Sequence, residues 1–346
     1  MQILLLDGGL GTTLESPPFN VTFTSSTPLW SSHLLTSSPT TLQAAHDAFY
    51  CAGADILLTA TYQSSTEGYT QTNASHTLED AARYMRSAIP LARSVISPSR
   101  PCRVALSLGP YGATMTPVAA EYTGIYPAVM DREDALREWH ARRLRVFVED
   151  SESWDGVDYV AVETVRRPDE VRAVRGAMSD VLHGQDDKPW WICGVFPAEK
   201  VDEEDVRQWV DAAVGEQGGL PRPWGLGLNC TRIDHVARIV SIMQDELHRL
   251  LHKADGFVDE WASVSGKPWL VVYPDGTKGE KYDPTTKTWI TSGTGSVQRP
   301  WDERFWDVIQ HQSEGDWEGI IIGGCCRAGP SNIASLRRRI DGSRHR

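Results

Sequence analysis

The chain has 346 residues, 40% of them apolar, and a formal net charge of −12. This size can bury a large core and suits one large α/β domain or two medium ones. The acidic balance argues against nucleic-acid binding, and no stretch approaches the ~20 consecutive apolar residues that cross a membrane. The apolar run at the N-terminus stops at Asp7 and has no basic segment before it, unlike a secretory signal. We therefore expect a cytoplasmic protein that acts on small molecules, whose oligomeric state the sequence leaves open.

Eight short, almost continuously apolar runs alternate with helical patterns along the chain. Such runs are typical of parallel strands that are covered on both faces. The predicted strands lie at 3–7, 54–62, 103–110, 157–164, 190–196, 224–230, 268–274 and 319–326. Eight strand–helix units predict a (β/α)8 TIM barrel, with a doubly wound open sheet as the alternative. We expect a single barrel domain over residues 1–340, followed by a short basic tail, 341–346.

Two long polar segments follow predicted strands and are expected as loops at the carboxyl face of the barrel. They span residues 15–37 and 274–300. The chain also has extra segments near 184–189 and 253–266, each of which lies before a predicted strand. Active sites of such barrels are built from the loops of the carboxyl face.

The predicted strand ends bring carboxylates and thiols to the same mouth. Asp7 ends the first strand, Glu163 lies at the end of the fourth, Cys230 ends the sixth, and Cys325 and Cys326 end the eighth. Three thiolates fit a tetrahedral zinc ion and leave one position open, as in a catalytic site. The alternatives are a redox-sensing disulfide between Cys325 and Cys326, or plain core thiols.

A substrate thiol is the natural fourth ligand, because zinc removes its proton and holds it as a thiolate. Asp7 and Glu163 are placed to bind an α-ammonium group beside that thiol, which suggests an amino-acid thiol such as homocysteine. The competing roles are a helix N-cap for Asp7, and an ion pair with Arg166 or Arg167 for Glu163.

Several segments together resemble the homocysteine S-methyltransferase family. They include "DGGLGTTLE", "AGADILLTATYQSS", "EYTGIY", "VAVETV", "GLNCTR" and "IIGGCCRAGP", and the resemblance covers nearly the whole chain. It implies a (β/α)8 barrel with Zn²⁺ on Cys230, Cys325 and Cys326 as the catalytic centre. It also implies that homocysteine is bound through Asp7 and Glu163, with Thr61 and Asn229 lining the site.

Within that family, "EYTGIY" and the "YD…KTW" segment look more like the branch that uses S-methylmethionine or S-adenosylmethionine than like the branch that uses betaine. The expected enzyme therefore transfers a methyl group from a sulfonium donor to homocysteine and gives methionine. Five tyrosines are candidates for the donor site, since aromatic faces attract cations: Tyr62, Tyr111, Tyr122, Tyr126 and Tyr273. The alternatives are another methyl donor such as betaine, another thiol or selenocysteine as acceptor, or a non-catalytic redox-sensing barrel.

Overall fold

A computed structural model of the chain describes most of its residues. The described residues are 1–24, 27–116, 119–182, 188–253, 266–277, 280–283, 288–291, 299–312 and 317–343. Within them, eight parallel strands form one sheet in the order β1-β10-β7-β6-β5-β4-β3-β2. The sheet closes on itself where Leu6 pairs with Ile56 and the Asp55 amide donates to the Leu5 carbonyl at 2.6 Å. The predicted single-domain (β/α)8 barrel is confirmed.

Each predicted strand appears, although most are shorter than the apolar run that predicted them. The strands of the barrel are β1 Gln2–Leu5, β2 Ile56–Leu58, β3 Arg103–Leu108, β4 Tyr159–Val165, β5 Trp190–Gly194, β6 Gly225–Asn229, β7 Trp269–Tyr273 and β10 Gly319–Ile322. Strands β4 to β7 are buried along their whole length. This burial on both faces explains why their sequences do not alternate with polar residues.

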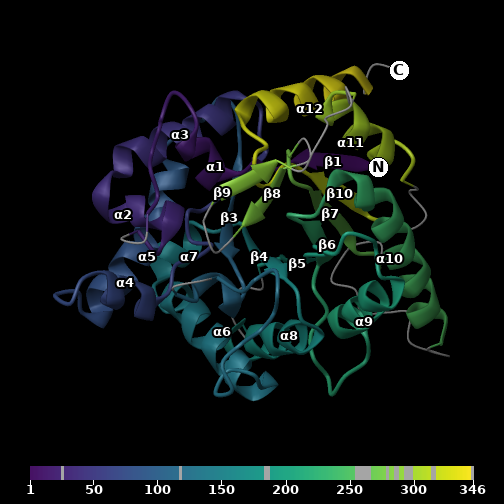
Figure 1. Cartoon of the computed structure of the whole chain (residues 1–346), viewed down its shortest axis with the longest axis horizontal. Helices are drawn as coiled ribbons and strands as arrows, with labels where there is room; N and C mark the ends of the chain where they lie inside the picture. The colour runs from purple at the N-terminus through teal and green to yellow at the C-terminus, as the bar shows by residue number, and fades with distance from the viewer. Residues whose placement is uncertain are drawn as a thin grey trace.

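Helices surround the strands as a ring (Figure 1). They are α1 Leu10–Glu15, α2 Leu34–Ser37, α3 Pro39–Cys51, α4 Thr66–Thr72, α5 Leu78–Arg93, α6 Glu133–Val148, α7 Ser151–Asp155, α8 Pro168–Leu182, α9 Glu203–Val214, α10 Ile233–Lys253, α11 Trp301–Ile309 and α12 Pro330–Ser343, with 3-10 turns η1 Trp30–His33 and η2 Tyr111–Thr114. None of the helices in these ranges is long and apolar enough to cross a membrane. The domain boundary expected at residue 340 falls inside α12, and residues 344–346 of the tail lie outside the described residues.

The apolar residues form an outer core between strands and helices and an inner core inside the barrel. On β4, Val160 and Val162 belong to the outer core, whereas Tyr159 and Ala161 belong to the inner one. Because side chains alternate along a strand, the next inward position on β4 is Glu163. The same alternation turns the last residues of several strands toward the mouth.

One predicted loop contains structure that the sequence pattern did not indicate. Residues 274–300 include a two-stranded antiparallel pair, β8 Glu280–Asp283 and β9 Thr288–Thr291. The rest of that loop is only partly described, and the extra segments at 184–189 and 253–266 lie mostly outside the described residues.

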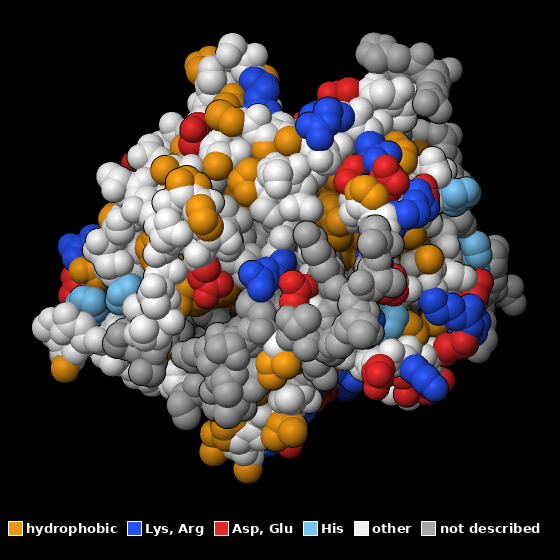
Figure 2. Space-filling model, turned by 45° about the horizontal axis from the view of Figure 1, so that its top comes forward, with side chains coloured by type: hydrophobic (Ala, Val, Ile, Leu, Met, Phe, Trp, Pro, Cys, Tyr) orange, Lys and Arg blue, Asp and Glu red, His pale blue; other side chains and the backbone are white. Residues whose placement is uncertain are grey.

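Figure 2 shows one face of the molecule, where positive and negative side chains are interspersed rather than gathered in a single patch.

Candidate active site

The carboxyl ends of four strands turn polar side chains into one mouth. On β3, Ser107 is the next inward position after Ala105, two residues along the strand. On β4, Glu163 is likewise the next inward position after Ala161. Asn229 ends β6, whose outward residues Leu226 and Leu228 pack in the outer core, and Tyr273 ends β7 in the inner core. The period of two residues along each strand therefore brings these side chains together.

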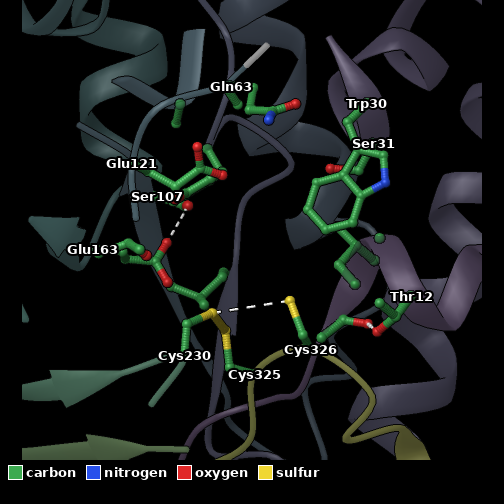
Figure 3. A pocket seen from close by; sticks show the side chains of 18 of the residues that line it. Thr12, Trp30, Ser31, Gln63, Ser107, Glu121, Glu163, Cys230, Cys325 and Cys326 are labelled. Atoms are coloured by element: carbon green, nitrogen blue, oxygen red, sulfur yellow. Dashed lines mark hydrogen bonds between the residues drawn. A yellow bond between two sulfur atoms is a disulfide. The ribbon is translucent and has the colours of Figure 1, made fainter. Parts of the chain in front are cut away.

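A cavity opens at this mouth, and Figure 3 shows its walls with the cysteines on one side. The predicted site residues that line it are Glu163, Asn229, Cys230, Cys325 and Cys326. Asp7 and Thr61 were predicted for the same site but are buried behind the cavity wall, 1% and 0% exposed. The structure thus brings five of the seven predicted residues to one cavity.

The three cysteines form a compact cluster. Their sulfur atoms lie within 4.8 Å of one another, and the Sγ atoms of Cys230 and Cys326 are 3.9 Å apart. Cys230 and Cys325 are joined by a disulfide, with an Sγ–Sγ distance of 2.10 Å. A disulfide between Cys325 and Cys326 was one alternative to zinc for these thiols, and the bond in the structure instead links the ends of β6 and β10. Three soft sulfur ligands suit zinc, and binding through all of them requires that this disulfide be reduced.

The two glycines before the paired cysteines are required by close packing. A side chain at Gly323 would lie 2.8 Å from the Asp7 carbonyl oxygen, and one at Gly324 would lie 2.3 Å from the Ala328 Cβ. The Gly324 amide donates to the same Asp7 carbonyl at 3.0 Å. The turn after β10 is therefore pressed against the turn after β1, which fixes Cys325 and Cys326 at the mouth.

Glu163 is a buried carboxyl that forms no ion pair with an arginine among the described residues, although the charge of Arg143 acts on it and opposes the rise of its pKa. Its side chain accepts a short hydrogen bond from the Ser107 hydroxyl, and burial raises its pKa to about 7. Arg166 binds Asp205 at 2.7 Å, and Arg167 binds Asp169, so neither forms the ion pair that was the alternative for Glu163. An ammonium group entering the cavity would offset the cost of ionising this carboxyl.

Asp7 closes the barrel rather than capping a helix. Its Oδ2 atom accepts from the Leu58 amide at 2.9 Å, at the seam between β1 and β2, and Gly9 is the N-cap of α1. Its Oδ1 atom is buried without a hydrogen-bond partner among the described residues, and burial holds the pKa of Asp7 well above its usual range. The Oδ1 atom thus lacks a protein partner among the described residues, but it lies behind the residues that line the cavity.

Thr61 lies beyond the end of β2, in the turn that follows Leu58. Its hydroxyl donates to the Ser107 carbonyl at 2.6 Å and contacts the Thr59 hydroxyl at 2.7 Å. Both contacts lie within the protein, so Thr61 supports the strand that carries Ser107.

Asn229 holds a strained residue in place. Thr164 adopts a positive φ of 62°, which is unfavourable for a β-branched side chain. The Asn229 Oδ1 atom accepts from the Thr164 amide at 2.7 Å, and its Nδ2 atom donates to the Thr164 hydroxyl at 2.8 Å. Asn229 thereby fixes the backbone directly after Glu163.

Other residues line the cavity that the sequence patterns did not single out. Phe23 comes from the loop after α1, Trp30 begins the 3-10 turn η1, and Glu121 comes from the loop after β3. The loop at 15–37 was expected at the carboxyl face and Glu121 begins the "EYTGIY" segment, but nothing in either segment singled out these three side chains. Of the five tyrosines proposed for donor binding, Tyr62, Tyr122 and Tyr273 line the cavity. Tyr111 and Tyr126 are not among its lining residues and pack against each other with ring centroids 5.2 Å apart.

Comparisons with known proteins agree on one family. A family profile described as "Homocysteine S-methyltransferase" matches residues 4–340. Homocysteine S-methyltransferase YbgG of Bacillus subtilis is 27% identical, over 96% of this chain and 93% of that protein. Selenocysteine Se-methyltransferase of Brassica oleracea var. italica is 28% identical, over 97% of this chain and 88% of that protein.

Solved structures support the fold. The crystal structure of the metallated form of the homocysteine methyltransferase MmuM from Escherichia coli aligns with a TM-score of 0.66. The alignment covers 98% of this chain and 96% of that one at 23% identity. At this identity the likeness shows the shared barrel.

Proposed function

This chain belongs to the homocysteine S-methyltransferase family and is therefore a methyltransferase, and we propose that it transfers a methyl group from a sulfonium donor to the thiol of L-homocysteine. S-methylmethionine is the proposed donor, S-adenosylmethionine a second candidate, and methionine the product. The observation that carries the proposal is the cluster of three cysteine sulfurs within 4.8 Å of one another, in the same cavity as the buried carboxyl of Glu163.

The cluster fits a zinc ion by its chemistry. It offers three sulfur donors, and the described residues place no fourth protein ligand in the same group. An open fourth position is typical of catalytic rather than structural zinc. Zinc held by Cys230, Cys325 and Cys326 would supply a Lewis acid that lowers the pKa of a substrate thiol and keeps it as a thiolate near neutral pH.

Glu163 is proposed to hold the α-ammonium group of homocysteine. Its carboxyl is 5% exposed and receives a hydrogen bond from Ser107, so its position is fixed before the substrate arrives. Binding of a cation favours the ionised carboxylate and lowers its pKa. Fixing the amino acid by its ammonium group restricts where its thiol can lie, and such positioning is a large part of many rate enhancements.

The proposed transfer balances without a covalent enzyme intermediate. A lone pair of the homocysteine sulfur forms the new S–CH₃ bond, and the electron pair of the broken C–S bond stays on the donor sulfur. The donor becomes a neutral thioether, and the thiol proton is released to solvent. The aromatic rings of Tyr62, Tyr122 and Trp30 line the cavity and suit the sulfonium cation.

Selenocysteine is a second candidate acceptor. The observation that favours it is the 28% identity to a plant selenocysteine Se-methyltransferase over 97% of this chain. A selenol would use the same open position, so the geometry of the cluster does not distinguish the two acceptors. A competition assay with homocysteine and selenocysteine in the same reaction does.

The test is to incubate reduced, zinc-loaded protein with homocysteine and one donor at a time. The donors are S-methylmethionine, S-adenosylmethionine and betaine, and the methionine formed is quantified by mass spectrometry. We expect methionine from a sulfonium donor and little from betaine. Zinc-loaded protein that forms no methionine with any donor would refute the proposed reaction.

A further inference from the structure

Glu121 is a buried carboxyl in the cavity that has no role in the account so far. It is 7% exposed and lines the cavity, and its Oε2 atom has no hydrogen-bond partner among the described residues. Burial raises its pKa to about 7. A buried acceptor without a partner costs roughly 1–3 kcal/mol, more for a charged group, so an unsatisfied carboxyl that faces a cavity indicates a missing ligand.

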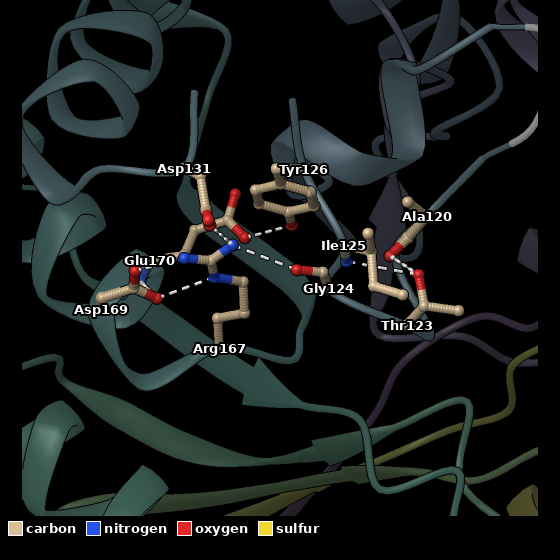
Figure 4. A network of polar contacts seen from close by, with 9 residues as sticks. All are labelled: Ala120, Thr123, Gly124, Ile125, Tyr126, Asp131, Arg167, Asp169 and Glu170. Atoms are coloured by element: carbon tan, nitrogen blue, oxygen red, sulfur yellow. Dashed lines mark hydrogen bonds and ion pairs between the residues drawn. The ribbon is translucent and has the colours of Figure 1, made fainter. Parts of the chain in front are cut away.

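The loop that carries Glu121 is anchored firmly. Arg167 donates to the Gly124 carbonyl at 3.0 Å and binds Asp131 and Asp169, each at 2.5 Å (Figure 4). Tyr126, five residues after Glu121, donates to Glu170 at 2.5 Å. Contacts at Gly124, Tyr126 and Asp131 therefore fix the path of the loop that follows Glu121.

The cavity contains two buried carboxyls from two separate elements. Glu163 lies near the end of β4, and Glu121 belongs to the loop after β3 (Figure 3). In the described part of the chain no lysine or arginine forms an ion pair with Glu121. Arg167 binds the Gly124 carbonyl, Asp131 and Asp169, and the buried Arg143 donates to the carbonyls of Gly109, Thr61 and Tyr62. Each carboxyl is thus available for a cation brought by a substrate.

We propose that Glu121 binds the α-ammonium group of the methyl donor, so that the enzyme selects sulfonium compounds that are also amino acids. This inference rests on the proposed function, in which homocysteine and the donor each bring one α-ammonium group. Glu163 takes that of homocysteine, and Glu121 takes that of the donor. Glu121 directly precedes Tyr122, and both line the cavity together with Tyr62.

The charge changes during the reaction explain why the ammonium group is the partner. The sulfonium loses its positive charge as the methyl group leaves. A carboxylate beside the sulfur would therefore stabilise the starting complex more than the transition state and slow the transfer. The α-ammonium charge persists throughout, so a carboxylate bound to it gives affinity and orientation without that loss.

The consequence is a preference that can be measured in the unmodified enzyme. S-methylmethionine and S-adenosylmethionine carry an α-ammonium group, whereas dimethylsulfoniopropionate is a sulfonium without one. A charge-assisted hydrogen bond contributes about 1.5–3 kcal/mol, which corresponds to about 10- to 100-fold in affinity. We expect S-methylmethionine to be preferred over dimethylsulfoniopropionate in kcat/KM by about that factor.

The decisive experiment compares Glu121→Gln with the wild type in the zinc-loaded enzyme. Glu121→Gln should raise the KM for S-methylmethionine by about 10- to 100-fold and leave that for dimethylsulfoniopropionate and for homocysteine within about twofold. The preference between the two donors should disappear with the carboxylate, as in a double-mutant cycle. Glu216→Gln, which removes an exposed carboxylate, is the matched control and should behave as the wild type.

The outcomes separate this inference from the proposed function. Equal preferences in wild type and Glu121→Gln, or a raised KM for homocysteine alone, would overturn the role of Glu121 while the reaction stands. If the wild type forms no methionine, the proposed reaction fails, and calorimetry of S-methylmethionine binding to both proteins still tests the site. If Glu121→Gln does not fold, the two donors compared in the wild type decide, and equal kcat/KM values refute the inference.

Discussion

Replacing Glu163 by glutamine should change how the stability of the metal-free protein depends on pH. Burial raises the pKa of Glu163 from its ordinary value of 4.5 to about 7. Between these values the unfolded chain releases the proton while the folded protein keeps it, so the folded state loses stability as the pH rises. A difference of about 2.5 pH units, at 1.36 kcal/mol per unit, amounts to roughly 3 kcal/mol. The glutamine side chain in Glu163→Gln stays neutral and can still accept a hydrogen bond from Ser107, so the variant should avoid this loss.

The assay is urea denaturation of reduced, metal-free wild type and Glu163→Gln at pH 5 and pH 8. On going from pH 5 to pH 8, the free energy of unfolding of the wild type should fall by roughly 2.5 kcal/mol more than that of the variant, because the unfolded carboxyl is already partly ionised at pH 5. Taking the difference between the two proteins removes the contribution of Glu121, which both share, whereas part of the difference reports the effect of the Glu163 charge on Asp7. Glu216→Gln, an exposed carboxylate, should track the wild type. Equal pH dependence in wild type and Glu163→Gln would refute the raised pKa of the buried Glu163 carboxyl.

Further predictions concern homocysteine binding and the strained turn at Thr164. If the ionised form of Glu163 binds the ammonium group, the KM for homocysteine should rise by up to about tenfold per pH unit below pH 7, beyond any rise in Glu163→Gln. Parallel pH profiles of KM in the two proteins would remove Glu163 from the binding site. Asn229→Ala removes both side-chain hydrogen bonds to Thr164 and should lower the free energy of unfolding by about 2–3 kcal/mol. Adding Thr164→Gly should restore part of that stability, because glycine adopts a positive φ without strain, and no recovery in the double variant would argue against strain at this residue.

The barrel could be predicted because its signals are local. Continuous apolar runs marked the strands, and the expectation that parallel strands end at one mouth placed Glu163 there, whereas Asn229 was expected from the family resemblance. The neighbourhood of Cys230 and Cys326 followed from the same rule, since parallel strands end at one face. The inferences for Glu163 and the cysteines need only the positions of the apolar runs and the direction of the strands.

The missing parts depend on contacts between distant segments. Thr61 was placed at a strand end, but β2 stops at Leu58, and the turn aims the hydroxyl at the Ser107 carbonyl. Glu121 lies in a polar loop whose course is set by Arg167, more than forty residues away, and no periodicity reports such a contact. The β8–β9 pair was missed for a related reason, because short strands in a polar loop lack an apolar pattern.

The central claim is that methyl transfer depends on a metal held by the three cysteines. It is tested most directly by measuring zinc content and methionine formation in the same preparations of wild type, Cys326→Ser and Cys51→Ser, the last replacing an exposed cysteine. Homocysteine labelled in its carbon chain distinguishes methionine made from the acceptor from methionine left by the donor. The account predicts about one zinc per chain and turnover in the wild type and Cys51→Ser, with both lost in Cys326→Ser. A zinc-free Cys326→Ser protein that forms labelled methionine at the wild-type rate would contradict it.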